Sequence, residues 1–106
     1  MNVRTSQPSL SLDTARSLVP VLKAISDEFR LAILLTLAEE SRTVTELTED
    51  LGITQPLVSH HLKALRDVGL ISVTAEGRSN RYSLCCGAVA EPIQLLSGLA
   101  GATPNK

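Results

Sequence analysis

The sequence predicts a mainly α-helical domain with one small β-hairpin, in the order helix, helix, helix, helix, strand, strand, helix. Nonpolar residues make up 43% of the 106-residue chain, yet only Phe29 and Tyr82 are aromatic, so the core must be built from aliphatic side chains. Nonpolar residues recur at helical spacing in several segments. After Gly69, two short alternating segments flank residues that favour a turn.

The length fits one domain, which we place at residues 11–101 between flexible polar tails at residues 1–10 and 102–106. No apolar run approaches the roughly 18 residues that a membrane span needs. The N-terminal segment Met1 to Ser11 is polar and lacks the layout of a signal peptide. We therefore expect a cytoplasmic protein that does not associate with membranes.

Two helices are expected before residue 40. Leu12 to Ile25 has helical spacing, although Pro20 should kink or restart that helix. Asp27 can cap the next helix, Glu28 to Glu39, which has little polar surface and should lie at the centre of the fold. Its nonpolar residues include Leu31, Ile33, Leu34, Leu35 and Leu37.

The next two helices form a candidate helix-turn-helix. Thr43 and Glu46 match a capping box, which opens a short helix that ends at Gly52. Thr54 can cap the second helix, Gln55 to Asp67, and Pro56 is tolerated in its first turn. The residues predicted to face inward are Leu57, Val58, Leu62 and Leu65.

The hairpin is predicted from strands at Leu70 to Ala75 and Arg81 to Cys85, with a turn at Glu76 to Asn80. A last helix is expected at Ala90 to Ala100, beginning late or kinked because of Pro92. Its stripe of Ile93, Leu96 and Leu99 or Ala100 has no evident cover within the chain. We expect this stripe to form a dimer interface.

The second helix of the pair has the chemistry of a recognition helix, which needs inward aliphatic residues and outward hydrogen-bonding groups. Gln55 can pair bidentately with adenine, and Ser59 can reach bases or phosphate from the same helix face. Lys63 and Arg66 are better placed for phosphates. Such residues often form only a solvated helix face, but their combination with a basic hairpin favours double-stranded DNA as the partner.

The hairpin resembles a wing that extends from Glu76 to Arg81. Arg78 and Arg81 could reach a minor groove or phosphates, with Asn80 between them. The net charge is −1, but residues 1–52 carry a formal charge of −3 and residues 53–106 a charge of +2, which puts the basic excess at this site. The candidate DNA-binding residues are Thr54, Gln55, Ser59, His60, Lys63, Arg66, Arg78, Asn80 and Arg81.

The two adjacent histidines do not suggest a shared metal ion. Neighbours on a helix diverge by about 100°, so His60 and His61 cannot easily bind one ion. We expect His60 to face the DNA and His61 to be packed.

The segment at residues 53–71, Ile-Thr-Gln-Pro-Leu-Val-Ser-His-His-Leu-Lys-Ala-Leu-Arg-Asp-Val-Gly-Leu-Ile, resembles the ArsR/SmtB family of bacterial repressors. Residues 24–34 are similar to that family's early helix start, and residues 77–84 to its wing. The resemblance covers roughly residues 15–100. It implies a winged helix-turn-helix homodimer, held together by its first and last helices, that binds a palindromic operator and is released by an inducer.

The inducer site departs from the pattern of well-known members. The helix at Thr45 to Leu51 lacks the Cys-x-Cys of arsenic and cadmium sensors, and the terminal helix lacks the Asp and His set of zinc sensors. Cys85 and Cys86 remain, and as neighbours they rarely have the geometry for a mutual disulfide. They are candidate ligands for a thiophilic metal or metalloid ion, candidate sites of thiol oxidation, or simply buried nonpolar residues.

Two other function classes fit the sequence less well. An enzyme would need more than Ser59 beside His60 or a cysteine with a histidine, and the chain has no nucleophile turn, phosphate loop or paired carboxylates. A winged helix that contacts another protein is compatible with the mildly acidic charge. We expect no enzymatic activity and favour the DNA-binding repressor.

Overall fold

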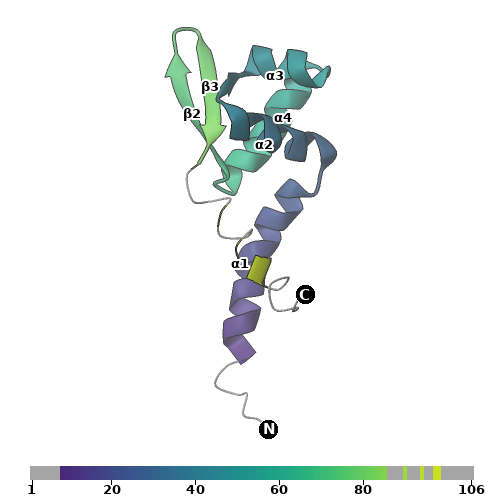
Figure 1. Cartoon of the computed structure of the whole chain (residues 1–106), viewed down its shortest axis with the longest axis vertical. Helices are drawn as coiled ribbons and strands as arrows, with labels where there is room; N and C mark the ends of the chain where they lie inside the picture. The colour runs from purple at the N-terminus through teal and green to yellow at the C-terminus, as the bar shows by residue number, and fades with distance from the viewer. Residues whose placement is uncertain (1–7, 86–89, 91–93, 95–96, 99–106) are drawn as a thin grey trace.

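The computed structural model describes residues 8–85 together with residues 90, 94, 97 and 98. The long first helix leads into a compact group of helices with a small sheet at one side (Figure 1). The elements are α1 (Pro8–Ile25), α2 (Glu28–Glu39), β1 (Arg42–Thr43), α3 (Val44–Leu51), α4 (Gln55–Asp67), β2 (Ile71–Glu76) and β3 (Ser79–Leu84). This order and the hairpin agree with the predicted winged helix-turn-helix.

Helix α1 begins earlier than predicted and does not restart at Pro20. It begins at Pro8, inside the predicted tail, since proline lacks only an N–H group that the first turn does not need. It then runs through Pro20 without a restart. Leu12 and Val19 on this helix are 49% and 43% exposed, so α1 carries nonpolar surface that no described residue of the same chain covers.

Helix α2 crosses the centre of the domain. The carboxylate of Asp27 caps it by accepting hydrogen bonds from the backbone N–H groups of Phe29 and Arg30, at 2.8 and 3.1 Å. Only one side of the helix is buried, and its buried residues are Ile33, Leu34 and Leu37. Leu31 and Leu35 are 44% and 63% exposed, although the nonpolar sequence predicted that this helix lies buried at the centre of the fold.

The sheet is antiparallel with the strand order β1, β3, β2. Strand β1, which the sequence did not indicate, pairs Arg42 with Tyr82 and Thr43 with Arg81. The hairpin is tighter than predicted, because Glu76 pairs with Ser79 and leaves a two-residue turn at Gly77 and Arg78. Gly77 has a φ of +61°, a conformation that glycine adopts without steric cost.

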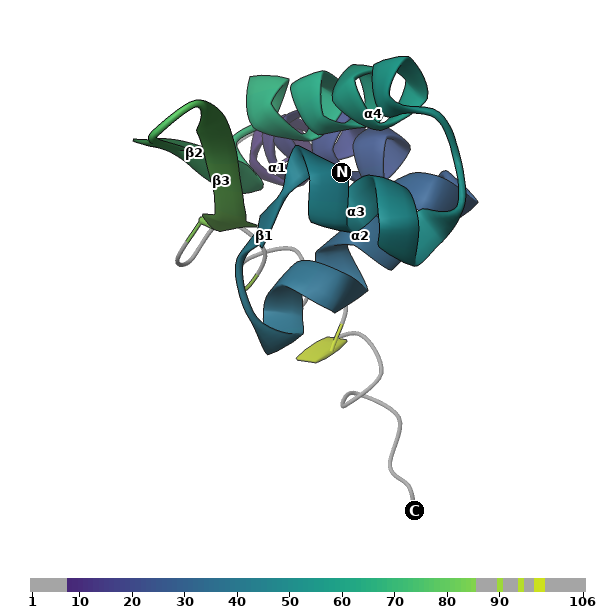
Figure 2. The same ribbon diagram turned by 90° about the horizontal axis from the view of Figure 1, so that it is seen from above.

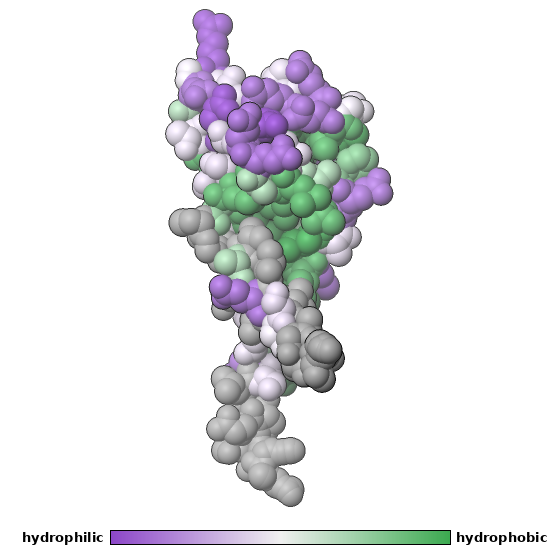
Figure 3. All heavy atoms as spheres, in the orientation of Figure 1, coloured by the Kyte–Doolittle hydropathy of each residue, from purple (hydrophilic) through white to green (hydrophobic). Residues whose placement is uncertain are grey.

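The core is aliphatic apart from Tyr82. It is formed by Ala24, Ile33, Leu34, Leu37, Leu47, Val58, Leu62, Leu65, Leu70, Ile71 and Tyr82. In Figure 3, hydrophilic surface gathers over the sheet and the short helices, and hydrophobic surface lies toward α1. Among the described residues, no helix has the length and nonpolar character of a membrane span.

The final predicted helix falls largely on residues that are not described. Ala90, Gln94, Ser97 and Gly98 have helical backbone, in agreement with the prediction. Ile93, Leu96, Leu99 and Ala100, the predicted interface stripe, lie outside the described residues. The tail at residues 102–106 also lies outside them.

Two leucines of α4 test how the helix is held. Leu62 is 1% exposed, whereas Leu57 is 39% exposed. We expect Leu62→Ala to lower the free energy of unfolding by about 2 to 5 kcal/mol, because it leaves a cavity in the core. Leu57→Ala should cost less than about 1 kcal/mol. Urea unfolding at one fixed protein concentration measures both, and equal losses would contradict the described orientation of α4.

Candidate nucleic-acid interface

The turn between α3 and α4 sets the direction of the second helix. Thr43 and Glu46 form a reciprocal capping box that starts α3. Gly52 ends it with a φ of 70°, and its N–H group donates to the carbonyl of Thr48 at 2.9 Å. Thr54 occupies the capping position of α4, but its side chain makes no capping hydrogen bond, so the expectation of a side-chain cap is corrected.

The two faces of α4 are sharply different. Val58, His61, Leu62 and Leu65 are buried. Leu57, predicted to face inward, lies at the margin of this stripe and is exposed. The candidate DNA-binding residues of this segment are all exposed, namely Thr54, Gln55, Ser59, His60, Lys63 and Arg66. The helix therefore presents one polar face, as a recognition helix must.

A hollow of about 320 Å³ joins the start of α4 to the hairpin. From above, the hairpin stands beside α4 in the same layer of the molecule (Figure 2). Sequence reasoning did not identify Thr45, which enters this hollow from the first turn of α3. The available signal was a polar side chain two positions after the Thr43 cap, at the start of the helix-turn-helix. The hollow is lined by Val44, Thr45, Gln55, Ser59, Arg78, Ser79, Asn80 and Tyr82.

A second hollow, of about 380 Å³, follows α4 toward its end. Because Ser59 and Tyr82 line both hollows, the two hollows form one continuous surface along the helix and β3. The other residues of the second hollow are Lys63, Arg66 and Asp67. The Nζ of Lys63 donates to Asp67 at 3.1 Å, but both side chains are more than half exposed, so a phosphate could replace the carboxylate at little cost.

The wing presents one of its two arginines as predicted and the other differently. Arg78 lies in the two-residue turn and is exposed, as is Asn80. Arg81 lies away from the tip in the middle strand, where it contacts Glu76, Glu46 and Ser41. The prediction made Arg81 the end of the wing, directly after an open turn at residues 76–80, whereas Ala75 pairs with Asn80 inside the ladder.

His61 is packed under α4, as expected. It is 5% exposed and stacks on Phe29 with 5.8 Å between the ring centroids. Arg30 donates from Nε to Nδ1 of His61 at 3.1 Å, which requires a neutral imidazole. Burial lowers the pKa of His61, and Arg30 and His60 add to this effect, while the Asp27 carboxylate 4.0 Å away opposes it.

The candidate thiol site is only partly described. Cys85 is half-buried, and its backbone N–H donates to the carbonyl of Leu70 at 3.0 Å, which ties the end of β3 to the residue before β2. Cys86 lies outside the described residues. Within residues 8–85 and the four described positions beyond, no three His, Cys, Asp or Glu side chains come together to hold a metal ion.

Comparison with known proteins links this geometry to a family. Residues 27–73 match the family described as "Bacterial regulatory protein, arsR family". The chain is 42% identical over 77 residues to the transcriptional repressor SmtB of Mycobacterium tuberculosis, covering 73% of this chain and 55% of SmtB. It is 38% identical over 78 residues to a probable mercury resistance operon repressor of Streptomyces lividans, covering 74% of this chain and 62% of that protein.

A solved structure gives the same result for the fold. The homodimeric winged helix-turn-helix DNA-binding domain Mb0332 of Mycobacterium bovis superimposes with a TM-score of 0.72 at 27% sequence identity. The match covers 92% of this chain and 90% of that domain. The chain therefore spans nearly all of the solved domain but little more than half the length of the two curated relatives.

The buried histidine leads to a prediction about pH. Because the pKa of His61 is lower in the fold than its ordinary value of 6.5, the unfolded chain binds a proton more readily. The stability that a neutral His61 contributes is fully present above pH 6.5, the ordinary pKa. It is lost as the pH falls from 6.5 toward the lower pKa of the folded protein. We expect thermal unfolding between pH 7.5 and 5 to show a smaller loss of stability in His61→Gln than in the wild type.

The matched control is His60→Gln, which removes the exposed neighbour and keeps His61. The acid-dependent loss of stability must persist in this control. If His61→Gln and the wild type lost stability equally over this range, the buried imidazole would not be the group that titrates.

Proposed function

Because the chain belongs to the ArsR family of bacterial regulatory proteins, we propose that it is a transcriptional repressor that binds double-stranded DNA as a homodimer. The observation that carries the proposal is the hollow in which Gln55 and Ser59 of α4 meet Arg78 and Asn80 of the wing. Two elements distant in sequence thus present hydrogen-bonding and basic groups on one surface.

Each part of this surface has a defined task in the proposal. Gln55 and Ser59 are four residues apart at the N-terminal end of α4, which enters the major groove, and they read base edges. Arg78 at the turn reaches the minor groove or a phosphate, with Asn80 beside it. Lys63 and Arg66 follow along the helix and contact phosphates.

The dimer places two copies of α4 on one face of the DNA. The nonpolar surface of α1, exposed in the single chain at Leu12 and Val19, supports an interface there. The homodimeric state of Mb0332 supports it as well. A two-fold dimer requires an operator with matching half-sites about 34 Å apart.

The binding test uses fluorescence anisotropy with the DNA upstream of the protein's own gene and with random DNA. We expect Gln55→Ala or Ser59→Ala to weaken operator binding by about 1 to 3 kcal/mol and to change random-DNA binding little. Arg78→Ala should weaken both, since a phosphate contact does not depend on sequence.

Salt provides the check on the proposal itself. Affinity of the wild type must fall steeply as salt rises, because phosphate binding releases counterions. An affinity that ignores both salt and DNA sequence would favour a winged helix that contacts another protein. Equal losses on both DNAs for Gln55→Ala would remove Gln55 from base reading.

For the inducer, we propose a thiophilic metal or metalloid ion that acts at Cys85 and Cys86. Soft ions prefer thiolate ligands, and the similarity to a mercury resistance operon repressor is in line with such an inducer. Two adjacent thiols supply an incomplete ligand set, so further ligands come from elsewhere, including the other subunit. Cys85 is hydrogen-bonded to Leu70 at the base of the hairpin, so ion binding there can shift the wing.

We expect arsenite to release the wild type from its operator and to leave a Cys85→Ser, Cys86→Ser double variant bound. Anisotropy during an arsenite titration measures the release, and a nickel titration serves as a comparison with a less thiophilic ion. Hydrogen peroxide in the absence of metal tests the redox alternative. Equal release of the wild type and the double variant by arsenite would remove the thiol site.

A further inference from the structure

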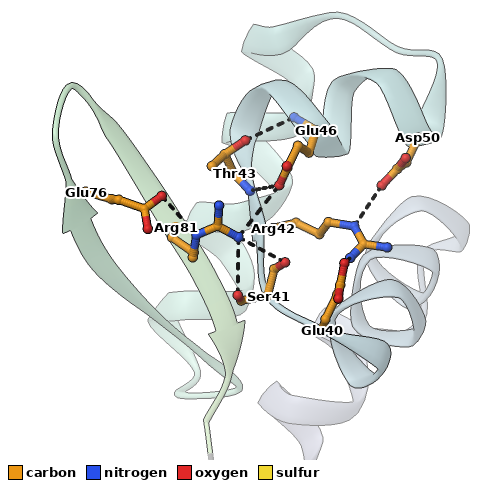
Figure 4. A network of polar contacts seen from close by, with 8 residues as sticks. All are labelled: Glu40, Ser41, Arg42, Thr43, Glu46, Asp50, Glu76 and Arg81. Atoms are coloured by element: carbon orange, nitrogen blue, oxygen red, sulfur yellow. Dashed lines mark hydrogen bonds and ion pairs between the residues drawn. The ribbon is translucent and has the colours of Figure 1, made fainter.

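Arg81 occupies the point where the wing meets the helix-turn-helix. It lies on β3, the middle strand, opposite Thr43 of β1 and Thr74 of β2. Its side chain is 33% exposed, so most of its surface is covered. Figure 4 shows its guanidinium pointing away from the hairpin tip and into a cluster of polar groups.

The guanidinium joins three separate segments of the chain. Its Nε donates to the carboxylate of Glu76 on β2 at 3.0 Å. Its Nη1 donates to the carbonyl and hydroxyl oxygens of Ser41, after α2, at 3.2 and 3.3 Å. The same Nη1 lies 3.8 Å from Oε1 of Glu46 on α3. No other described arginine connects the wing to the helices in this way.

Glu46 gives this connection a second consequence. The oxygen that faces Arg81, Oε1, also accepts the hydrogen bond from the backbone N–H of Thr43 at 2.9 Å, which completes the capping box of α3. The first helix of the helix-turn-helix and the base of the wing therefore share one carboxylate oxygen (Figure 4). Movement of the wing relative to α3 must disturb at least one of these contacts.

We propose that Arg81 is a positioning residue that fixes the wing against the helix-turn-helix and does not itself contact DNA. The inference rests on the proposed DNA-binding function. Arg78, three residues earlier, is its natural contrast, because it is exposed and has no hydrogen bond or ion pair to a described residue. One arginine sets the geometry of the wing, and the other is free to meet a phosphate.

The distinction can be tested because lysine replaces an arginine that serves as a point charge, but not one that uses several donors of a rigid fork. We expect Arg81→Lys to raise the hydrogen-exchange rate of the β2 and β3 amides in the free protein and to weaken operator binding by about tenfold. The matched control, Arg78→Lys, should keep the wild-type exchange rates of these amides, because Arg78 has no hydrogen bond or ion pair to a described residue.

Glu76→Ala makes the test sharper, because charge and geometry predict opposite signs. Removing a negative charge near DNA should by itself tighten binding to any sequence. If Glu76 instead holds Arg81 and the wing in place, Glu76→Ala weakens operator binding and speeds exchange in the hairpin. Thermal unfolding of each variant confirms that the domain remains folded.

The proposal would be overturned by wild-type affinity and exchange rates in Arg81→Lys, or by tighter operator binding and unchanged exchange in Glu76→Ala. The proposed function would be contradicted by a different result, which is the absence of salt-dependent DNA binding in the wild type. In that event the exchange rates, measured without DNA, still decide whether Arg81 holds the wing.

Discussion

The direction of the polar face of α4 depends on the burial of its nonpolar face. Val58, Leu62 and Leu65 are almost completely removed from solvent, and rotating the helix would expose them. At about 25 cal/mol for each Å² of nonpolar surface, exposing three such side chains would cost several kcal/mol, a large part of the stability of a domain this small. This constraint fixes the direction of Gln55 and Ser59 without any contact to either of them.

Polar contacts then set the angle of the hairpin, which the nonpolar core leaves undetermined. A hydrophobic core is not directional, so it can hold a hairpin near α4 without fixing its angle. Tyr82 anchors the base of the hairpin in the core and lines both hollows. The hydrogen bonds of Arg81 to Ser41 and Glu76 add direction. The recognition surface thus combines a helix placed by packing with a wing placed by charged hydrogen bonds.

The sequence predicted best those features that depend on neighbouring residues. The capping box of Thr43 and Glu46, the helix end at Gly52 and the aliphatic stripe of α4 are all local patterns, and each is present in the structure, although Leu57 is exposed at the margin of the stripe. Strand β1 was missed because two residues carry no periodicity, and their partners on β3 lie nearly 40 positions away. Arg81 was misplaced for a related reason, since the turn length depends on cross-strand pairing that the sequence of the turn alone does not determine.

Ion pairs between arginines and acidic residues explain how a chain with a net charge of −1 can offer a basic surface. Arg81 faces Glu46 and Glu76, and Arg42 lies within 2.9 and 3.2 Å of the carboxylates of Glu40 and Asp50. These acidic groups are therefore partly neutralised by arginines that hold the fold together. Arg66 and Arg78 have no ion pair to a described residue, and Lys63 has only an exposed one. The charge that a phosphate meets is set by Lys63, Arg66 and Arg78 and not by the net charge of the chain. Salt screens charges that lie more than about 10 Å from the phosphate.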